Sequence, residues 1–139
     1  MEYRLAAQVM LLRGNQTLLL KRENTGYEDG NFGFPAGHIE FGETVKSAAA
    51  REANEEIGVD IEESNLQVTG VMHRIKKVTY VDFFLTCHKW SGEPFNREPE
   101  KCSGLKWVEV EDLPDTMVPY IAIGISLGTD QMWFHQLES

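Results

Sequence analysis

One stretch governs how this chain folds: residues 34–59, which read FPAGHIEFGETVKSAAAREANEEIGV. Its first part, up to Thr44, is rich in glycine and other turn-forming residues and is predicted to be a loop. Its second part is predicted to be a helix that ends before Gly58, at a position where a left-handed residue is common. An apolar stripe with a spacing of four residues would pack this helix on a sheet. Its members are Val45, Ala49, Ala53 and Ile57.

Three acidic residues lie close together near the end of the predicted helix. Because each residue turns a helix by about 100°, Glu52, Glu55 and Glu56 share one side, about a quarter turn from the apolar stripe. Like charges so placed repel one another, and a hard divalent cation would neutralise them. The alternative is a solvated acidic helix end without a ligand. The preceding loop favours the cation.

The loop before the helix has two glycines, Gly37 and Gly42, with the spacing of a phosphate-binding P-loop. A P-loop continues with lysine and then serine or threonine, whereas here the next residues are Glu43 and Thr44. An acidic residue in place of the lysine indicates that phosphate is contacted through a metal ion. EF-hand spacing is absent, which argues against calcium buffering.

Loop and helix together resemble the signature of the Nudix hydrolases, and every fixed polar and glycine position is filled. One position departs from the pattern, since Ala53 stands where a larger aliphatic residue is usual. The resemblance implies an enzyme with the Nudix fold, an α/β/α sandwich with a mixed β-sheet. The residues with an implied structural role in the signature are Gly37, Gly42, Glu43, Arg51 and Gly58.

The rest of the chain alternates between strand-like and turn-like segments. The segment 5–12 and a strand that begins at Thr17 and ends at Arg22 flank a Gly-Asn turn and predict a hairpin. A second helix is predicted over 119–127, and 132–137 is either a last strand or a helical extension. The other predicted strands are 32–35, 66–75, 79–90 and 105–110, with loops at 23–31 and 96–104.

Length and composition predict one domain, residues 1–139, with a sizeable core. The net charge of −9 argues against a nucleic-acid-coating surface but allows a nucleotide ligand, because a bound metal supplies local positive charge. Cys87 and Cys102 are predicted to be free thiols. No signal peptide or membrane span is visible, so we expect a cytoplasmic protein with no membrane partner.

The resemblance implies metal ligands and catalytic residues. The carboxylates of Glu52, Glu55 and Glu56 and the carbonyl of Ala36 would bind Mg²⁺, with Mn²⁺ as a second possibility. Residues 90–98 resemble a loop of the MutT-type branch that brings a further glutamate to the metal. Glu98 matches that position best, with Glu100 as the alternative. The general base is expected among Glu52, Glu55 and Glu98.

Three residues are predicted to bind substrate. Arg22 matches a phosphate-binding position of the branch, Phe34 would line a nucleobase slot, and Arg74 belongs to a basic patch that could meet polyphosphate. Structural alternatives stand beside each prediction: a solvated strand end for Arg22, a core position for Phe34, and a soluble sheet edge for the basic patch. The patch comprises His73, Arg74, Lys76 and Lys77.

The predicted reaction is Mg²⁺-dependent hydrolysis of nucleoside triphosphates to nucleoside monophosphate and pyrophosphate. The compact length favours it, because many ADP-ribose hydrolases of the family carry an added dimerisation region. The alternatives are another nucleoside diphosphate linked to X, such as ADP-ribose or a nucleotide sugar, and a non-catalytic nucleotide-sensing module. Residues 115–119 lack the asparagine that reads oxidised purines in some members. We expect a monomer or homodimer.

Overall fold

The structure, a computed structural model, describes residues 2–138. Within them, strands and helices alternate along the chain. In order they are β1 (Tyr3–Arg13), β2 (Gln16–Arg22), β3 (Phe32–Gly33), β4 (Ala36–His38), α1 (Val45–Ile57), the short 3-10 helix η1 (Glu63–Asn65), β5 (Leu66–Ile75), β6 (Thr79–Cys87), β7 (Cys102–Glu109), α2 (Pro119–Ser126) and β8 (Trp133–Glu138).

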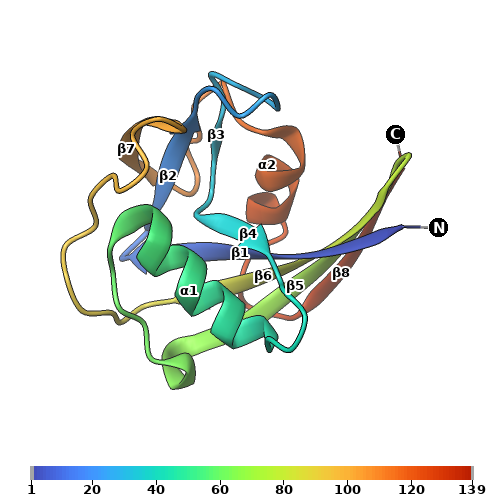
Figure 1. The fold of residues 1–139 in the computed structure, drawn as a ribbon, viewed down its shortest axis with the longest axis horizontal. Helices are drawn as coiled ribbons and strands as arrows, with labels where there is room; N and C mark the ends of the chain where they lie inside the picture. Colours follow the sequence, from blue (N-terminus) through green and yellow to red (C-terminus); the bar gives the residue numbers. More distant parts are fainter. Residues whose placement is uncertain (1, 139) are drawn as a thin grey trace.

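The strands form one mixed sheet in the order β3-β2-β1-β6-β5-β8, with β4 paired to β1 and β7 paired to β2 (Figure 1). Strand β1 organises it. Its first nine residues run parallel to β6, its middle pairs antiparallel with β4, and its last two residues pair with β2 across the predicted hairpin turn. β1 therefore joins the long strands of the sheet to the smaller group formed by β2, β3 and β7.

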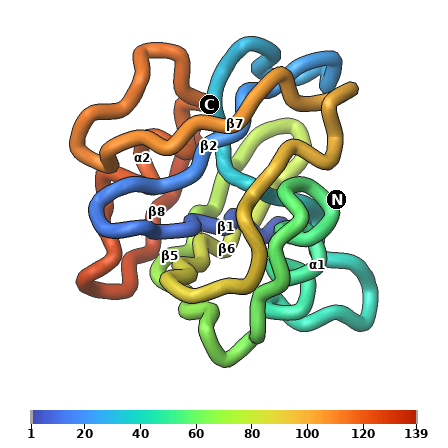
Figure 2. The backbone as a smooth tube through the Cα atoms, turned by 90° about the vertical axis from the view of Figure 1, so that its left-hand side faces the viewer, coloured from blue at the N-terminus to red at the C-terminus, as the bar shows by residue number. Residues whose placement is uncertain are grey.

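Neighbouring residues of β1 point to opposite faces of the sheet. Val9 and Leu11 enter a core cluster with Ala53 and Ile57 of α1. Met10 enters a second cluster, which includes side chains of α2. Figure 2 shows α1 and α2 on either side of β1 and β6. The predicted α/β/α sandwich with a mixed sheet is confirmed.

Helix α1 forms over the predicted residues, and the structure shows why it begins and ends there. The Thr44 hydroxyl accepts a hydrogen bond from the Ser47 amide at 3.1 Å, and the Ser47 hydroxyl accepts one from the Thr44 amide at 3.0 Å. This capping box satisfies two amides of the chain around the helix start. The helix ends at Gly58, which has the left-handed φ of 72°.

Several predicted segments differ from the structure at their boundaries, three of them over three residues each. Residues 36–38 form strand β4 and not a loop, because the backbone of β1 pairs with them. Residues 102–104 belong to β7, since they pair with the end of β2. Residues 88–90 lie outside β6, which stops at Cys87, the last of its residues to pair with β1 and with β5. Near the C-terminus, where a strand and a helical extension were both possible, the structure has a strand, β8.

Candidate active site

The backbone of β4 passes directly over a carboxylate of α1. A Cβ atom added at Gly37 would lie 2.1 Å from the carboxyl carbon of Glu52. A side chain at this position would displace the carboxylate, so glycine is what lets the strand approach the carboxylate this closely. The glycine thus brings the acidic face of α1 against the chain that carries Ala36.

Glu56 reaches the same strand one residue earlier. Its carboxylate accepts a hydrogen bond from the Ala36 amide at 3.0 Å. Burial, and then the nearby negative charge of Glu52, raise the pKa of Glu56 well above its ordinary value. Burial also raises the pKa of Glu52, although the Arg51 guanidinium opposes this. Carboxylates crowded in this way repel one another, and a bound cation would reduce this repulsion.

Arg51 is the centre of an ion-pair network. Its guanidinium donates two hydrogen bonds to Glu43, at 2.7 and 2.9 Å, one to Glu52 at 2.7 Å and one to Glu55 at 3.3 Å. It also donates to the His38 carbonyl at 3.0 Å. The two bonds from Arg51 lower the pKa of Glu43 to about 2. The network ties the Gly42 turn and β4 to the helix that carries the acids.

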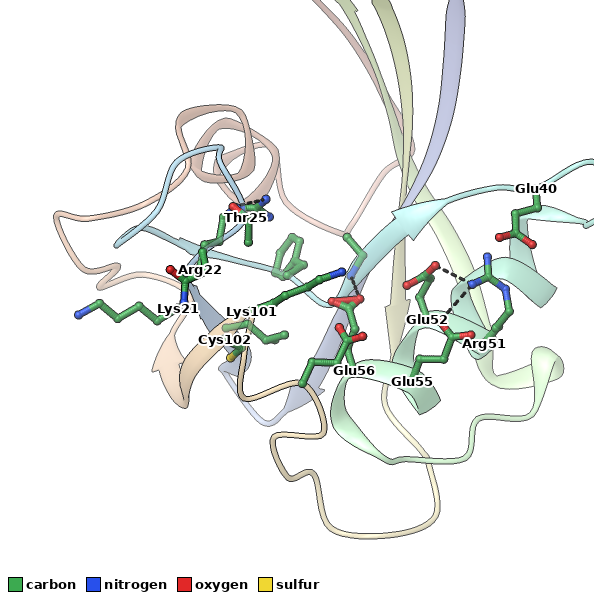
Figure 3. A pocket seen from close by; sticks show the side chains of 15 residues that line it. Lys21, Arg22, Thr25, Glu40, Arg51, Glu52, Glu55, Glu56, Lys101 and Cys102 are labelled. Atoms are coloured by element: carbon green, nitrogen blue, oxygen red, sulfur yellow. Dashed lines mark hydrogen bonds and ion pairs between the residues drawn. The ribbon is translucent and has the colours of Figure 1, made fainter.

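A cavity of about 520 Å³ opens in front of the acidic face (Figure 3). Apart from Arg51, which is paired with the acidic residues, the charges are segregated. In Figure 3, Lys21 and Arg22 lie on the side away from Glu52 and Glu55, and the Lys101 side chain extends between the two groups. Phe34 and Ala36 also line the cavity. The acidic residues that line the cavity are Glu40, Glu52, Glu55, Glu56 and Glu98.

The structure brings most of the predicted site residues to this cavity. Arg22 lines it, although its guanidinium is already bonded to the Tyr27 carbonyl at 2.8 Å and to the Thr25 hydroxyl at 3.2 Å. Phe34 lines it and is also a buried core residue at 5% exposure, so its core position is confirmed, whereas its contact with a nucleobase stays a prediction.

Arg74 does not line the cavity. It is buried in the layer below α2, where its guanidinium donates to Asp82 at 2.5 Å and lies 3.7 Å from the centre of the Tyr120 ring. The exposed basic patch expected around it is therefore not formed by Arg74. The alternation of β5 turns this side chain into the protein interior.

Seven residues that line the cavity were not among the predicted site residues: Leu20, Lys21, Asn24, Thr25, Glu40, Lys101 and Cys102. Lys21 and Cys102 come together because β7 pairs with β2 near residues 21 and 22. Lys101 reaches the cavity because the chain turns back after Glu98, whose carbonyl accepts the Lys101 amide at 2.9 Å. The pairing of β7 with β2 is long-range, and no local sequence pattern predicts it. The turn from Glu98 to Lys101 is local, but the Lys101 carbonyl also accepts the amide of Glu23, just after β2, at 2.9 Å, and this long-range bond holds the turn beside the cavity.

The donor set of the cavity suits a divalent cation. Carboxylate oxygens and a main-chain carbonyl are the hard ligands that Mg²⁺ and Mn²⁺ prefer. Within residues 2–138, no three acidic, histidine or cysteine side chains enclose a single point closely enough to hold an ion as they stand. Instead the Arg51 guanidinium lies between Glu52 and Glu55 and supplies the positive charge there.

Comparison with known proteins identifies the family. Residues 2–124 match the NUDIX domain, and the chain belongs to the Nudix hydrolases. Over 120 residues it is 26% identical to the 8-oxo-dGTP diphosphatase of Escherichia coli, covering 85% of this chain and 92% of that protein. It is 35% identical to the enzyme of the same name from Haemophilus influenzae over 86 residues, or 62% of this chain and 60% of that one.

Other relatives carry other activities. The chain is 41% identical to an ADP-ribose pyrophosphatase of Methanocaldococcus jannaschii, but over only 54 residues, or 39% of this chain and 31% of that enzyme.

Among solved structures, a MutT NUDIX hydrolase from Burkholderia pseudomallei superposes with a TM-score of 0.83 at 28% identity, covering 91% of this chain and 98% of that one.

Fold, site and comparisons agree on the class. This is a MutT-type Nudix hydrolase, an enzyme that acts on the phosphoanhydrides of small nucleotides. Members of this family generally use divalent metal ions. None of the helices in residues 2–138 combines the length and apolar character needed to span a bilayer.

Proposed function

We propose that the protein hydrolyses nucleoside triphosphates in the presence of Mg²⁺ and releases nucleoside monophosphate and pyrophosphate. The observation that carries this proposal is the segregation of charge in the cavity, with clustered carboxylates on one side and Lys21 and Arg22 on the other. A triphosphate could lie between them. The extended similarity to 8-oxo-dGTP diphosphatases supports the same substrate class.

The proposed metal ligands are the Ala36 carbonyl and four carboxylates. A Mg²⁺ ion bound there would offset the charge of the phosphates and lower the pKa of a water molecule. Mn²⁺ has the same ligand preference and would substitute. The carboxylates lie on a rigid helix and on one docked loop. They belong to Glu52, Glu55, Glu56 and Glu98.

The chain's own residues would perform the remaining tasks. Arg51 holds Glu52 and Glu55 in place and keeps the Gly42 turn on the helix. Lys21, Arg22 and Lys101 would bind phosphate oxygens, and Phe34 would contact the nucleobase. The hydrogen bonds from Arg22 to its own loop would orient the guanidinium for this task. The general base is proposed to be Glu52, Glu55 or Glu98, whichever lies within hydrogen-bond reach of the attacking water.

A second candidate substrate is a nucleoside diphosphate linked to X, such as ADP-ribose or a nucleotide sugar. The match to an ADP-ribose pyrophosphatase favours it, although that match covers less than half of this chain. Products separate the two, because a triphosphate yields pyrophosphate, whereas ADP-ribose yields two monophosphates. A non-catalytic sensing module would be expected to lose acidic residues of the signature, and all of them are present.

The test is turnover of a panel of canonical and oxidised nucleoside triphosphates, ADP-ribose and nucleotide sugars with Mg²⁺, with products identified by ³¹P NMR. Glu56→Gln is the inactive variant, and Glu111→Gln is the control, since it makes the same change of charge at an exposed residue outside the cavity. Pyrophosphate release that needs Mg²⁺ and is lost in Glu56→Gln is expected.

Other outcomes have definite meanings. Turnover of ADP-ribose or nucleotide sugars alone would replace the substrate and keep the chemistry. Binding of nucleotides without turnover of any would establish the sensing module. Since residues 115–119 contain no asparagine, we expect no strong preference for 8-oxo-dGTP over dGTP.

A further inference from the structure

The loop that carries Glu98 is fastened to the C-terminal end of α1. The last carbonyls of a helix have no partner within it and need donors from elsewhere. Here the Ile57 carbonyl accepts the Phe95 amide at 3.0 Å, and the Glu56 carbonyl accepts the Arg97 amide at 3.1 Å. Two residues of the loop thus satisfy two terminal carbonyls of the helix that bears the acidic cluster.

The side chain of Arg97 completes this contact. Its guanidinium donates to the Asn54 carbonyl at 3.0 Å and to the Asn54 side-chain oxygen at 3.3 Å. A positive charge near the C-terminus of a helix is favourable, and α1 has no basic residue of its own in its last turn. Asn54 is held in turn by Asp60, whose carboxylate accepts its amide at 2.9 Å.

Immediately after Arg97 the backbone of Glu98 is fixed on both sides. Its amide donates to the Asn96 side-chain oxygen at 3.1 Å, and its carbonyl accepts the amides of Lys101 and Cys102 at 2.9 and 3.0 Å. The Asn96 side chain also donates to the Cys102 carbonyl at 2.7 Å. The loop is therefore a rigid unit, and its attachment to α1 sets where the Glu98 carboxylate lies relative to Glu56.

We propose that Arg97, together with Asn54, is a positioning residue that aligns Glu98 with the carboxylates of α1 so that they bind one divalent-cation centre. This inference rests on the proposed role of the cavity as a metal site. Neither residue lines the cavity, so neither would touch metal or nucleotide. Their contribution acts through Glu98 alone.

The sign of the effect distinguishes positioning from simple electrostatics. The positive charge of Arg97 repels a cation bound nearby, so its removal would, by electrostatics alone, strengthen cation binding. Loss of alignment would weaken it, typically by 10- to 100-fold for residues that orient metal ligands. We therefore expect Arg97→Gln to weaken Mn²⁺ binding about 10-fold, and Asn54→Ala to weaken it in the same direction. Arg97→Lys, which keeps a donor and the charge, should restore most of the affinity.

The experiment measures Mn²⁺ affinity without nucleotide, by the EPR signal of the free ion, and hydrogen exchange of the Phe95 and Arg97 amides. Lys89→Gln is the control, because it removes the same charge from an exposed residue outside both this loop and the cavity. Faster amide exchange together with weaker Mn²⁺ binding is expected in Arg97→Gln and not in Lys89→Gln. In steady-state assays the half-saturating Mn²⁺ concentration should rise by the same factor, with kcat recovered at saturating Mn²⁺.

Mn²⁺ binding that is unchanged or tighter in Arg97→Gln overturns this inference, whatever the activity. A wild-type protein that binds Mn²⁺ but hydrolyses no nucleotide overturns the proposed function, while the Mn²⁺ affinity of Arg97→Gln still decides the role of Arg97. A wild-type protein that binds no Mn²⁺ overturns both.

Discussion

At the scale of single residues, the candidate site depends on space and charge around one helix. Gly37 leaves room for the Glu52 carboxylate, and Arg51 joins that carboxylate to Glu43. Neither effect is visible in an amphipathic pattern of the helix, since both involve residues that precede it, Gly37 in β4 and Glu43 in the turn after β4. Small substitutions at Gly37 and Glu43 should therefore have measurable effects on metal binding and on stability, respectively.

Gly37→Ala should damage the site more than the fold. The added methyl would overlap Glu52, but this carboxylate is the far end of a flexible side chain and can move aside. We expect Mn²⁺ affinity and turnover to fall about 10-fold or more, with little change in unfolding temperature. Gly104→Ala is the matched control, because its Cβ would meet nothing within 4 Å. Equal Mn²⁺ affinity in the two variants would refute the steric argument.

Glu43→Gln should change how stability depends on pH. The folded pKa of Glu43, about 2, lies below its ordinary value of 4.5, so its contribution is present above pH 4.5 and is lost as pH falls toward 2. The wild type should therefore unfold at a higher temperature than Glu43→Gln at pH 7. The gap should close between pH 4.5 and 2. Thermal unfolding across this range is the measurement, and a gap that is constant with pH would contradict it. Glu111→Gln, at an exposed residue, should show no such gap.

At the scale of elements, α1 combines features that are favourable and unfavourable for a helix. Its apolar stripe packs on β1, and Ala49, Ala53 and Ile57 have no exposed surface. Its acids lie near the C-terminal end, where the helix dipole disfavours negative charge. Packing, the capping box and the contacts of Arg51 and Arg97 offset this cost. An element held by tertiary contacts can present charges that an isolated helix would not tolerate.

The capping box should have a measurable share in this stability. Thr44→Ala removes the oxygen that accepts the Ser47 amide and should lower the free energy of unfolding by about 1 kcal/mol. Thr44→Ser keeps that oxygen and should be close to wild type. Urea unfolding of the two variants is the measurement. Equal losses in both would show that the methyl group of Thr44, and not its hydroxyl, stabilises the helix start.

At the scale of the whole molecule, the layer between the sheet and α2 contains a buried ion pair. Asp82 of β6 has no exposed surface, and Arg74 of β5 lies between it and the rings of Tyr80 and Tyr120. Tyr120 belongs to α2, so the arginine links the two strands to the helix above them. This arrangement accounts for the position of Arg74 inside the protein.

Breaking this pair should be costly, whereas replacing both partners should not. Asp82→Ala leaves a buried guanidinium without its carboxylate, and we expect a loss of about 3–5 kcal/mol in the free energy of unfolding. The double variant Arg74→Met with Asp82→Leu should lose less than Asp82→Ala. Urea unfolding tests both. Glu2→Ala, which breaks the exposed pair with Arg4, should change little. A double variant less stable than Asp82→Ala would contradict the argument.

The sequence by itself determined the helix Val45–Ile57, its acidic face, most strand positions and the family, because periodicity, caps and the fixed spacing of the signature are local. Tertiary structure alone decided the rest. Strand β4 forms because its backbone pairs with β1. Its residues, Ala-Gly-His, have no strand pattern of their own. Lys101 reaches the cavity and Arg74 does not, because strand pairing and side-chain direction between distant segments set where each charge lies. Local sequence therefore fixes most of the elements, whereas long-range pairing fixes the others and decides which side chains meet.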